Sequence, residues 1–338
     1  MDRSLQTYLR LLGLAVFLWL VIVAISFLLI KLGSTAPLVL LGGPNPTPEF
    51  EAQLIADYGL NQPAVVQFIR YAVRTLTGEF GRSWFTGEQV AVELFARLPA
   101  TLELLLYAVL LGGLIGVPTG IAAAFSRGSA QDRATRAGGL FGEAMPAFLL
   151  ALLLLLVFFR WLDMAPAPAG RISIVLTPPP TITGSYFIDS VLIKDSTAAR
   201  SALAQLFLPV TTLALLIAAT LALSVRAAVL TQLQTAHFAY ARAQGISRDL
   251  LTGIALRGAG PAIWTAANRQ FAALLGTTAV VEYVFAWGGV GQYGLDAMVK
   301  ADMAAVQGFV LLMAAIALLV HALARVIRRV ARLRFTRA

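Results

Sequence analysis

Long apolar runs alternate with shorter polar segments along the whole chain, and their lengths decide the class of structure. Six of these runs reach roughly 20 residues, which is the length that an α-helix needs to cross the hydrocarbon core of a bilayer. Such runs must be helical, because unpaired backbone amides in lipid cost several kcal/mol each. The pattern therefore predicts an all-α membrane protein with six transmembrane helices. They lie at about Leu9–Ile30, Ala100–Ala124, Gly139–Phe159, Leu206–Val225, Ile263–Phe285 and Val306–Val326.

The first apolar run also invites comparison with a cleaved signal peptide. Its apolar stretch after Arg10 is about 20 residues long, which exceeds the 7–15-residue core of a secretory signal. Small residues of the kind found at a cleavage site do follow the run, at Ser34, Thr35 and Ala36. The length favours a retained membrane helix.

Two of the polar segments between the runs are large. Segment 31–97 holds "TPEFEAQLIADYGL", in which Thr47 is a plausible N-cap and Pro48 suits the first helical position. A second helix is expected after Pro63. The pattern predicts three parts: the first helix with a helical extracytoplasmic subdomain (1–97), a membrane core (98–327) and a basic tail (328–338). Segment 160–205 is rich in proline at its start and shows less helical pattern.

Charge supports the membrane assignment and sets its orientation. Only 13% of residues are charged, against about a quarter in soluble domains, and the mean hydropathy is +0.79. If the N-terminus is cytoplasmic, the inner segments carry fifteen arginines and three acids, whereas the outer segments carry nearly balanced charge. This positive-inside bias predicts that both termini are cytoplasmic. It also explains the net charge of +9 without a nucleic-acid partner.

Residue types exclude several chemistries. The chain has no cysteine and only two histidines, His237 and His321, so neither a thiolate nor a histidine-based catalytic or zinc site is expected. A P-loop needs glycine before its lysine, and none of the three lysines follows a glycine. The chain therefore cannot carry a standard P-loop, and energy from ATP would have to come from another subunit. A membrane-embedded enzyme is correspondingly disfavoured.

A short basic segment interrupts the last third of the chain. Residues 237–261 read "HFAYARAQGISRDLLTGIALRGAGP", and Gly245 divides them into two pieces. Ser247 can cap the second piece, and Asp249 is favourable near its positive end. Pro261, together with neighbouring glycines, is expected to stop the fifth membrane helix from extending backward. The predicted result is a helix–glycine turn–helix on the cytoplasmic side, either an interfacial pair lying on headgroups or a docking element for a partner.

Several stretches resemble one family. "YARAQGIS" followed by "ALRGAGP" resembles the EAA loop of binding-protein-dependent ABC importer permeases, and more narrowly of the dipeptide/oligopeptide/nickel family. Further likeness lies in "GPNPTPEF", "GEFGRSW", "RLPATLELLLYAVLLGGLIGVPTGIAAA", "AMPAFLLALLL" and "VVEYVFAWGGVGQYGLDAMVKADMAAVQGFVLL". The first outer segment resembles the first of the two permeases that such systems encode. Ala239 and Tyr240 depart from the wider consensus, which has Glu and Ala there.

The resemblance implies a type I importer fold and a set of partners. These are a second permease, which is expected to be a related chain, two cytoplasmic ATPase subunits that bind ATP and Mg, and an extracytoplasmic substrate-binding protein. No cofactor is expected in this chain, and the implied location is the bacterial inner membrane. Peptides are the family's usual cargo, with nickel chelates, glutathione-like conjugates and modified peptides left open. The residues implied to contact the ATPase are Tyr240, Ala241, Arg242, Gly245, Ser247 and Asp249.

Polar residues at membrane depth are costly and are therefore candidates for a translocation pathway. Arg269 is the sharpest, because it lies within the fifth run between Asn268 and Gln270 and could meet a carboxylate-bearing cargo or a structural acid. Glu103 and Glu282 lie near the ends of their runs. For Glu103 the alternative is that its side chain reaches water at the membrane surface. For Glu282 the resemblance favours a structural or gating role. A gradient-driven transporter or channel would need an intramembrane acid or histidine relay and inverted halves, and neither is visible.

Overall fold

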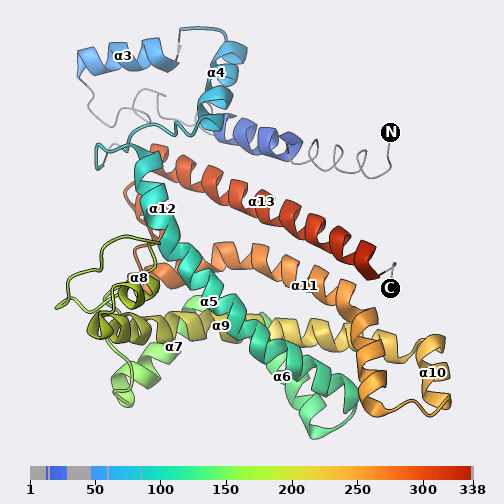
Figure 1. Cartoon of the computed structure of the whole chain (residues 1–338). Coiled ribbons are helices and arrows are strands. Elements are labelled where there is room, and N and C mark those ends of the chain that lie inside the picture. The colour runs from blue at the N-terminus through green and yellow to red at the C-terminus, as the bar shows by residue number, and fades with distance from the viewer. Residues whose placement is uncertain (1–12, 14–15, 29–46, 59–60, 84, 336–338) are drawn as a thin grey trace. The chain divides into compact units, whose positions relative to one another are not determined.

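The computed structural model describes residues 13, 16–28, 47–58, 61–83 and 85–335. Over this part of the chain the structure is helical, and its only β pairing is an isolated bridge between Arg82 and Gln89. The chain divides into two compact units, one of residues 1–99 with 289–326 and one of residues 100–288 with 327–338. Helix labels follow Figure 1. The order is α3 (Pro48–Tyr58), α4 (Ala64–Leu76), α5 (Val90–Phe125), α6 (Ala130–Ala144), α7 (Ala147–Leu154), the π-helical η1 (Leu155–Trp161), α8 (Tyr186–Leu192), α9 (Ser196–Leu233), α10 (Ala236–Ala243), α11 (Arg248–Val284), α12 (Val290–Val299) and α13 (Met303–Phe335).

In the first unit, the two helices expected between residues 31 and 97 are confirmed as α3 and α4. The hydroxyl of Thr47 accepts a hydrogen bond of 3.3 Å from the amide of Phe50, so Thr47 caps α3 as predicted. Helix α4 begins directly after Pro63. Residues 31–46 of the predicted subdomain and the first residues of the predicted span Leu9–Ile30 lie outside the described residues.

Asp302 ties the first unit together at the start of α13. One carboxylate oxygen accepts a hydrogen bond of 3.1 Å from the amide of Ala305, and the other accepts one of 2.5 Å from the hydroxyl of Ser83. Nearby, the start of α5 packs against α12 and α13 through a buried apolar cluster. The acid thus serves both as a helix cap and as an anchor for the turn before α5.

The second unit is arranged around α9, whose side chains are largely buried. Glycines at every fourth position of α5 lie against backbone atoms of Ala214, Ala218 and Ala222 on α9, so that the two helix backbones are in contact. Helix α6 approaches α9 through Gly139 and Gly142, which meet the side chains of Leu223 and Ala219, and Gly258 of α11 meets the side chain of Gln232 on α9. In membrane proteins, small residues at helix interfaces permit this packing where apolar burial alone gives little driving force. The three α5 glycines are Gly112, Gly116 and Gly120.

The third predicted span is wrong in its geometry. Helix α6 ends at Ala144, α7 begins at Ala147, and the two are bent by 107°. Met145, before Pro146, has an extended backbone (φ −77°, ψ 118°), which is the conformation that proline imposes on its predecessor. Pro146 therefore lies at a bend and not inside one straight helix.

The predicted start of the fifth membrane helix is also wrong. Helix α11 runs without interruption from Arg248 to Val284 and contains Pro261 in its interior. The second piece of the basic segment is therefore not a separate short helix. It is the first part of the helix that carries Arg269 and Glu282.

By length and composition, three described helices can cross a bilayer on their own: α5, α9 and residues Met303–Val326 of α13. The bent pair α6–α7 with η1 would make a fourth. A shorter apolar helix, Val16–Leu28, lies within the first predicted span. The structure thus shows a helical protein with several apolar spans, while six crossings stay a prediction from the sequence.

Candidate functional site

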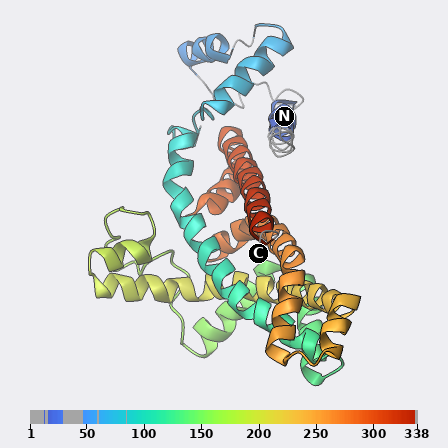
Figure 2. The same cartoon turned by 45° about the vertical axis from the view of Figure 1, so that its right-hand side comes forward.

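The basic segment forms a helix, a tight turn and the start of a long helix. The hydroxyl of Thr235 caps α10 by accepting a hydrogen bond of 3.3 Å from the amide of Phe238. Gly245 follows α10 with φ +74°, a left-handed conformation that favours glycine. Ser247 then occupies the N-cap position of α11, but its side chain makes no capping hydrogen bond there, so only the position agrees with the prediction. Both views place α10 at one end of α9 beside the first turns of α11 (Figures 1 and 2).

Most of the residues expected to contact an ATPase are exposed on this turn. Tyr240 has 66% of its surface exposed. Arg242, Gly245, Ser247 and Asp249 are exposed as well. Ala241 differs, because only 4% of its surface is exposed. Ala241 therefore packs against this chain, and its side chain offers no surface for a close approach by a partner.

Glu103 on α5 is buried, and its carboxylate oxygens are hydrogen-bonded within the chain. Its carboxylate forms an ion pair with Arg171 at 2.6 Å and accepts a hydrogen bond of 2.5 Å from the hydroxyl of Ser185. Arg171 also donates to the carbonyl of Gly184 at 2.5 Å and stacks over the ring of Tyr186, 3.8 Å from its centroid. Glu103 therefore holds the segment 171–187 against α5.

Glu282 lies near the end of α11 and is completely buried. Its side chain accepts a hydrogen bond of 2.7 Å from the hydroxyl of Thr101 on α5. Close by, the indole of Trp287 donates to the carbonyl of Ala100 at 3.0 Å. These contacts lock the end of α11 and the glycine-rich turn after it onto α5.

Arg269 is exposed in the middle of α11, and its neighbours Asn268 and Gln270 are half-buried. The side-chain oxygen of Asn268 is buried and has no hydrogen-bond partner among the described residues. Thirteen residues separate Arg269 from Glu282 along α11, which is about 20 Å at 1.5 Å per residue. The five polar candidates therefore do not converge on one site within this chain.

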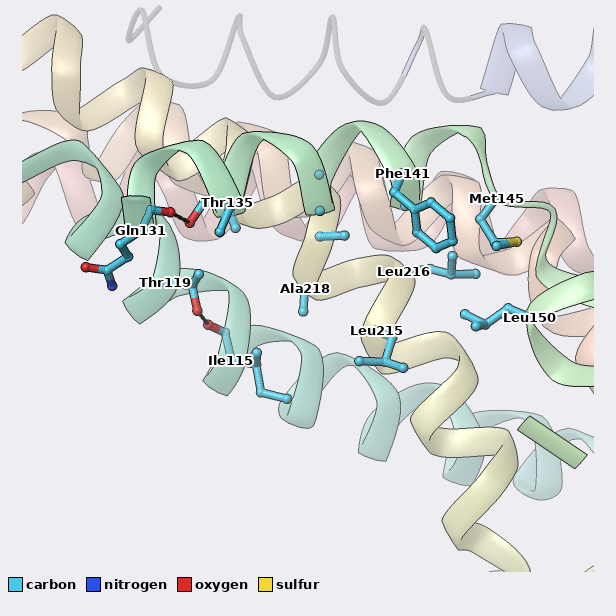
Figure 3. Close-up of a pocket in the computed structure, with 16 residues that line it drawn as sticks. Ile115, Thr119, Gln131, Thr135, Phe141, Met145, Leu150, Leu215, Leu216 and Ala218 are labelled. Carbon is cyan, nitrogen blue, oxygen red and sulfur yellow. Dashed lines mark hydrogen bonds between the residues drawn. The ribbon is translucent and has the colours of Figure 1, made fainter. Parts of the chain in front are cut away.

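The structure also contains features that the sequence analysis missed. An apolar cavity of about 520 Å³ lies among α5, α6, α7 and α9. Figure 3 shows Phe141, Met145 and Leu150 toward one end of it and Gln131 toward the other. The close packing of α5 against α9 was also missed, and its sequence signal was the glycine at every fourth residue of α5. No charged side chain lines the cavity, so a charged cargo finds no partner there.

A second feature that the sequence analysis missed is an ion pair between α6 and α9. Arg226 forms an ion pair with the buried Asp132, including a hydrogen bond of 3.0 Å from Nη2. Asp132 also accepts a hydrogen bond of 2.9 Å from the amide of Gly128. This one acid and this one arginine, from two predicted cytoplasmic segments, thus pair with each other, whereas Arg133 and Arg242 of the same segments are exposed.

Several apolar helices of spanning length, packed through small residues, define a multi-pass helical membrane protein. Residues 116–337 match the family described as "Binding-protein-dependent transport system inner membrane component", and the chain belongs to this family. It is therefore the non-catalytic, membrane-spanning permease subunit of a binding-protein-dependent ABC importer.

Curated relatives are similar over nearly their whole length. The di/tripeptide transport system permease DppB of Pseudomonas aeruginosa is 32% identical over 92% of this chain and 93% of its own. The probable D,D-dipeptide transport system permease DdpB of Escherichia coli is 34% identical over 84% of each chain. The dipeptide transport system permease DppB of E. coli is 31% identical over 94% of this chain and 95% of its own.

Proposed function

We propose that this permease forms half of a transmembrane dimer that imports peptides or related small solutes. The names of its relatives, which are di- and tripeptide permeases, support this cargo class. In this proposal the chain crosses the inner membrane six times with both termini in the cytoplasm. Residues 1–97 then supply the first crossing and an extracytoplasmic subdomain, 98–327 the core, and 328–338 a basic tail.

The exposed turn around Gly245 is the observation that carries the coupling mechanism. We assign the ATPase contact to the side chains that this turn displays, among them the aromatic ring of Tyr240 and the cation of Arg242. Gly245, Ser247 and Asp249 complete the displayed surface. Ala241 is buried, and in this proposal it packs α10 against the rest of the permease. Two partner ATPases would bind ATP and Mg, and their closure would move this segment.

Helix α11 gives that motion a path into the membrane. The helix begins immediately after the turn and continues without a break to Glu282. A displacement of its first turn is therefore carried as a rigid element toward Asn268, Arg269 and Gln270, where we place the cargo pathway. Glu103 and Glu282 would set the outer end of that pathway by fixing the loops and helix ends around it. A second permease, related to this one, would supply the facing wall.

The test is an affinity purification from native membranes, followed by mass spectrometry. Gly245→Trp places a bulky side chain where no atom lies within 4 Å, at φ +74°. Gly128→Trp is a matched control, because Gly128 also has open space and φ +83°, in another predicted cytoplasmic turn.

We expect the wild type and Gly128→Trp to retain the second permease and the ATPases. Gly245→Trp should retain the second permease and lose the ATPases. Recovery of ATPases with Gly245→Trp at the wild-type level would refute the assignment of the contact. Their absence from the wild-type sample would refute the proposed assembly.

A further inference from the structure

Helix α4 carries an apolar stripe that the other described residues of its unit leave uncovered. Val65, Ile69, Val73 and Leu76 recur at spacings of four, four and three residues, which places them on one side of a helix. Their exposed fractions are 68%, 54%, 54% and 67%. A stripe of this kind on a 13-residue helix needs an apolar environment beyond the residues that the structure describes.

The stripe borders the face by which α4 packs against the apolar helix Val16–Leu28. The hydroxyls of Tyr71 and Ser26 are hydrogen-bonded at 2.9 Å, and the ring of Phe27 lies 5.6 Å from that of Phe68. On a helical wheel at 100° per residue, Phe68 and Thr75 lie about 60–80° from Val65, and Ala72 lies between them and the stripe. The surface of α4 is therefore continuous with that of the neighbouring helix.

That neighbouring helix displays apolar side chains to its surroundings. Phe17 and Ile25 have 61% and 53% of their surfaces exposed, as expected for a helix that faces lipid. Arg70 lies on the other border of the stripe, where its exposed cation can reach headgroup phosphates. Arg74 lies beyond it on the polar face, in an ion pair with Glu79 at 3.1 Å. An exposed apolar face, an arginine at its edge and a polar face beyond it are together typical of a helix that lies in a membrane interface.

We propose that α4 lies in the membrane surface with Val65, Ile69, Val73 and Leu76 inserted among the acyl chains of the phospholipids and Arg70 at their headgroups. A helix at this position would fix the depth and tilt of the helix Val16–Leu28 in the bilayer. The two helices are joined by the hydrogen bond between Tyr71 and Ser26 and by the contact between the rings of Phe27 and Phe68. This goes beyond the importer function and rests only on the proposed membrane crossing of Val16–Leu28. Helix α3 differs in composition, since its residues include the acids Glu49, Glu51 and Asp57.

The absence of cysteine from the sequence allows single-cysteine variants to report one position each. The assembled transporter is reconstituted in nanodiscs of phosphatidylethanolamine and phosphatidylglycerol, and Ile69→Cys is labelled with a fluorophore. Ile25→Cys is the lipid-facing control, Glu49→Cys is the water-facing control, and the wild-type chain gives the labelling background. Quenching is measured with a lipid nitroxide placed near the headgroup and with aqueous iodide.

We expect the lipid nitroxide to quench the Ile69 probe at least twofold more than the Glu49 probe, and iodide to show the opposite order. Iodide quenching of Ile69 equal to that of Glu49 would overturn the proposal, because the stripe would then face water. Protection from both quenchers would also overturn it, because a protein would then cover the stripe. Labelling of Glu49→Cys by a membrane-impermeant maleimide tests the side of the membrane separately, so a wrong topology is distinguishable from a wrong depth.

Discussion

Gly116 on α5 lies directly against the backbone of Ala218 on α9. A Cβ atom added to Gly116 would lie 2.8 Å from the carbonyl oxygen of Ala218 and 2.9 Å from its Cα. The three nearest atoms all belong to the main chain, so no flexible side chain can move aside. This contact sets the distance between the two helices at the centre of the second unit.

Gly116→Ala should therefore destabilise the protein by about 1–3 kcal/mol, as overpacking of an interior generally does. Gly113→Ala is the matched control, because nothing lies within 4 Å of a Cβ at that position. We expect the control to be neutral or slightly stabilising, since alanine is the better helix former. The check is the thermal midpoint of the purified protein in detergent. Equal midpoints for the two variants would show that α5 and α9 can separate without cost.

The sequence predicted elements whose signals are local. Thr47 and Pro48 mark the start of α3, and Gly245 marks the turn after α10, because capping and left-handed backbone depend on a few neighbouring atoms. The class of the protein followed from the apolar runs for a similar reason. Each run must satisfy its own backbone hydrogen bonds in lipid.

Proline shows where local signals fail. Pro146 lies at the bend between α6 and α7, whereas Pro209 and Pro261 lie inside α9 and α11. Gly260 before Pro261 has no Cβ to meet the proline ring, which eases the helical conformation there. Leu208 precedes Pro209 and has no such relief, yet α9 continues because that stretch is buried among its neighbours. Tertiary packing decides these cases, and the residues near a proline do not reveal it.

For the predicted site residues, too, the sequence revealed the local features and not the contacts between distant residues. The exposed Tyr240 and the Gly245 turn follow from the polar segment itself. The burial of Ala241, and the ion pair between Glu103 and Arg171, depend on residues that are distant in sequence. Pattern alone therefore located the turn but could not tell which of its side chains face inward.

The two adjacent residues Tyr240 and Ala241 should give opposite phenotypes. Tyr240→Ala removes an exposed ring and should weaken ATPase binding at least tenfold, as loss of an interface anchor does, without changing the thermal midpoint of the permease. Ala241→Leu should instead lower that midpoint, because the added atoms must enter a buried position. Titration of purified ATPase onto the reconstituted permease measures the first effect. The assignment of the two faces is wrong if Tyr240→Ala unfolds the permease as readily as Ala241→Leu.

Removing one partner of the buried pair between Glu103 and Arg171 should cost more than removing both. Glu103→Gln leaves the Arg171 cation buried, where its Nε already has no hydrogen-bond partner. Breaking a buried pair on one side costs about 3–5 kcal/mol. In a double-mutant cycle with Arg171→Leu, we expect a coupling energy of about 1–3 kcal/mol, measured from thermal or denaturant unfolding. A coupling energy near zero would mean that the two residues act independently.

Asp189 should make the segment before α8 sensitive to acid but not to pH changes around neutrality. Burial raises the pKa of its carboxyl group, but hydrogen bonds from Thr183 and from the amides of Ile182 and Gly184 outweigh this effect, so the pKa lies below its ordinary value of 3.8. A carboxyl with a lowered pKa contributes stability above its unfolded pKa and loses it as the pH falls through the folded pKa. The contribution should therefore be constant between pH 5 and 8 and disappear only below about 3.8.

Asp189→Asn tests this at constant pH by removing the charge. We expect the amides of residues 182–184, which the carboxylate accepts at 2.8–3.2 Å, to exchange hydrogen about tenfold faster in the variant at pH 7. In the wild type, exchange normalised to the intrinsic rate should stay flat from pH 8 to 5. Unchanged exchange in Asp189→Asn would show that shape alone, and not the charge, holds the segment.

Arg269 provides the most direct test of the cargo pathway, because its cation is exposed in the middle of an apolar helix and can pair with a carboxylate. Arg269→Gln should lower uptake of a dipeptide at least tenfold while leaving ATPase binding and the thermal midpoint unchanged. Arg269→Lys keeps the positive charge and should restore a large part of the uptake. Wild-type transporter in proteoliposomes should prefer a free-carboxylate peptide over its C-terminal amide, and Arg269→Gln should erase that preference. If Arg269→Gln reduces the uptake of the free-carboxylate peptide and of the amide by the same factor, Arg269 does not contact the carboxylate. If it loses stability instead, the residue pairs with an acid of the partner permease and serves assembly.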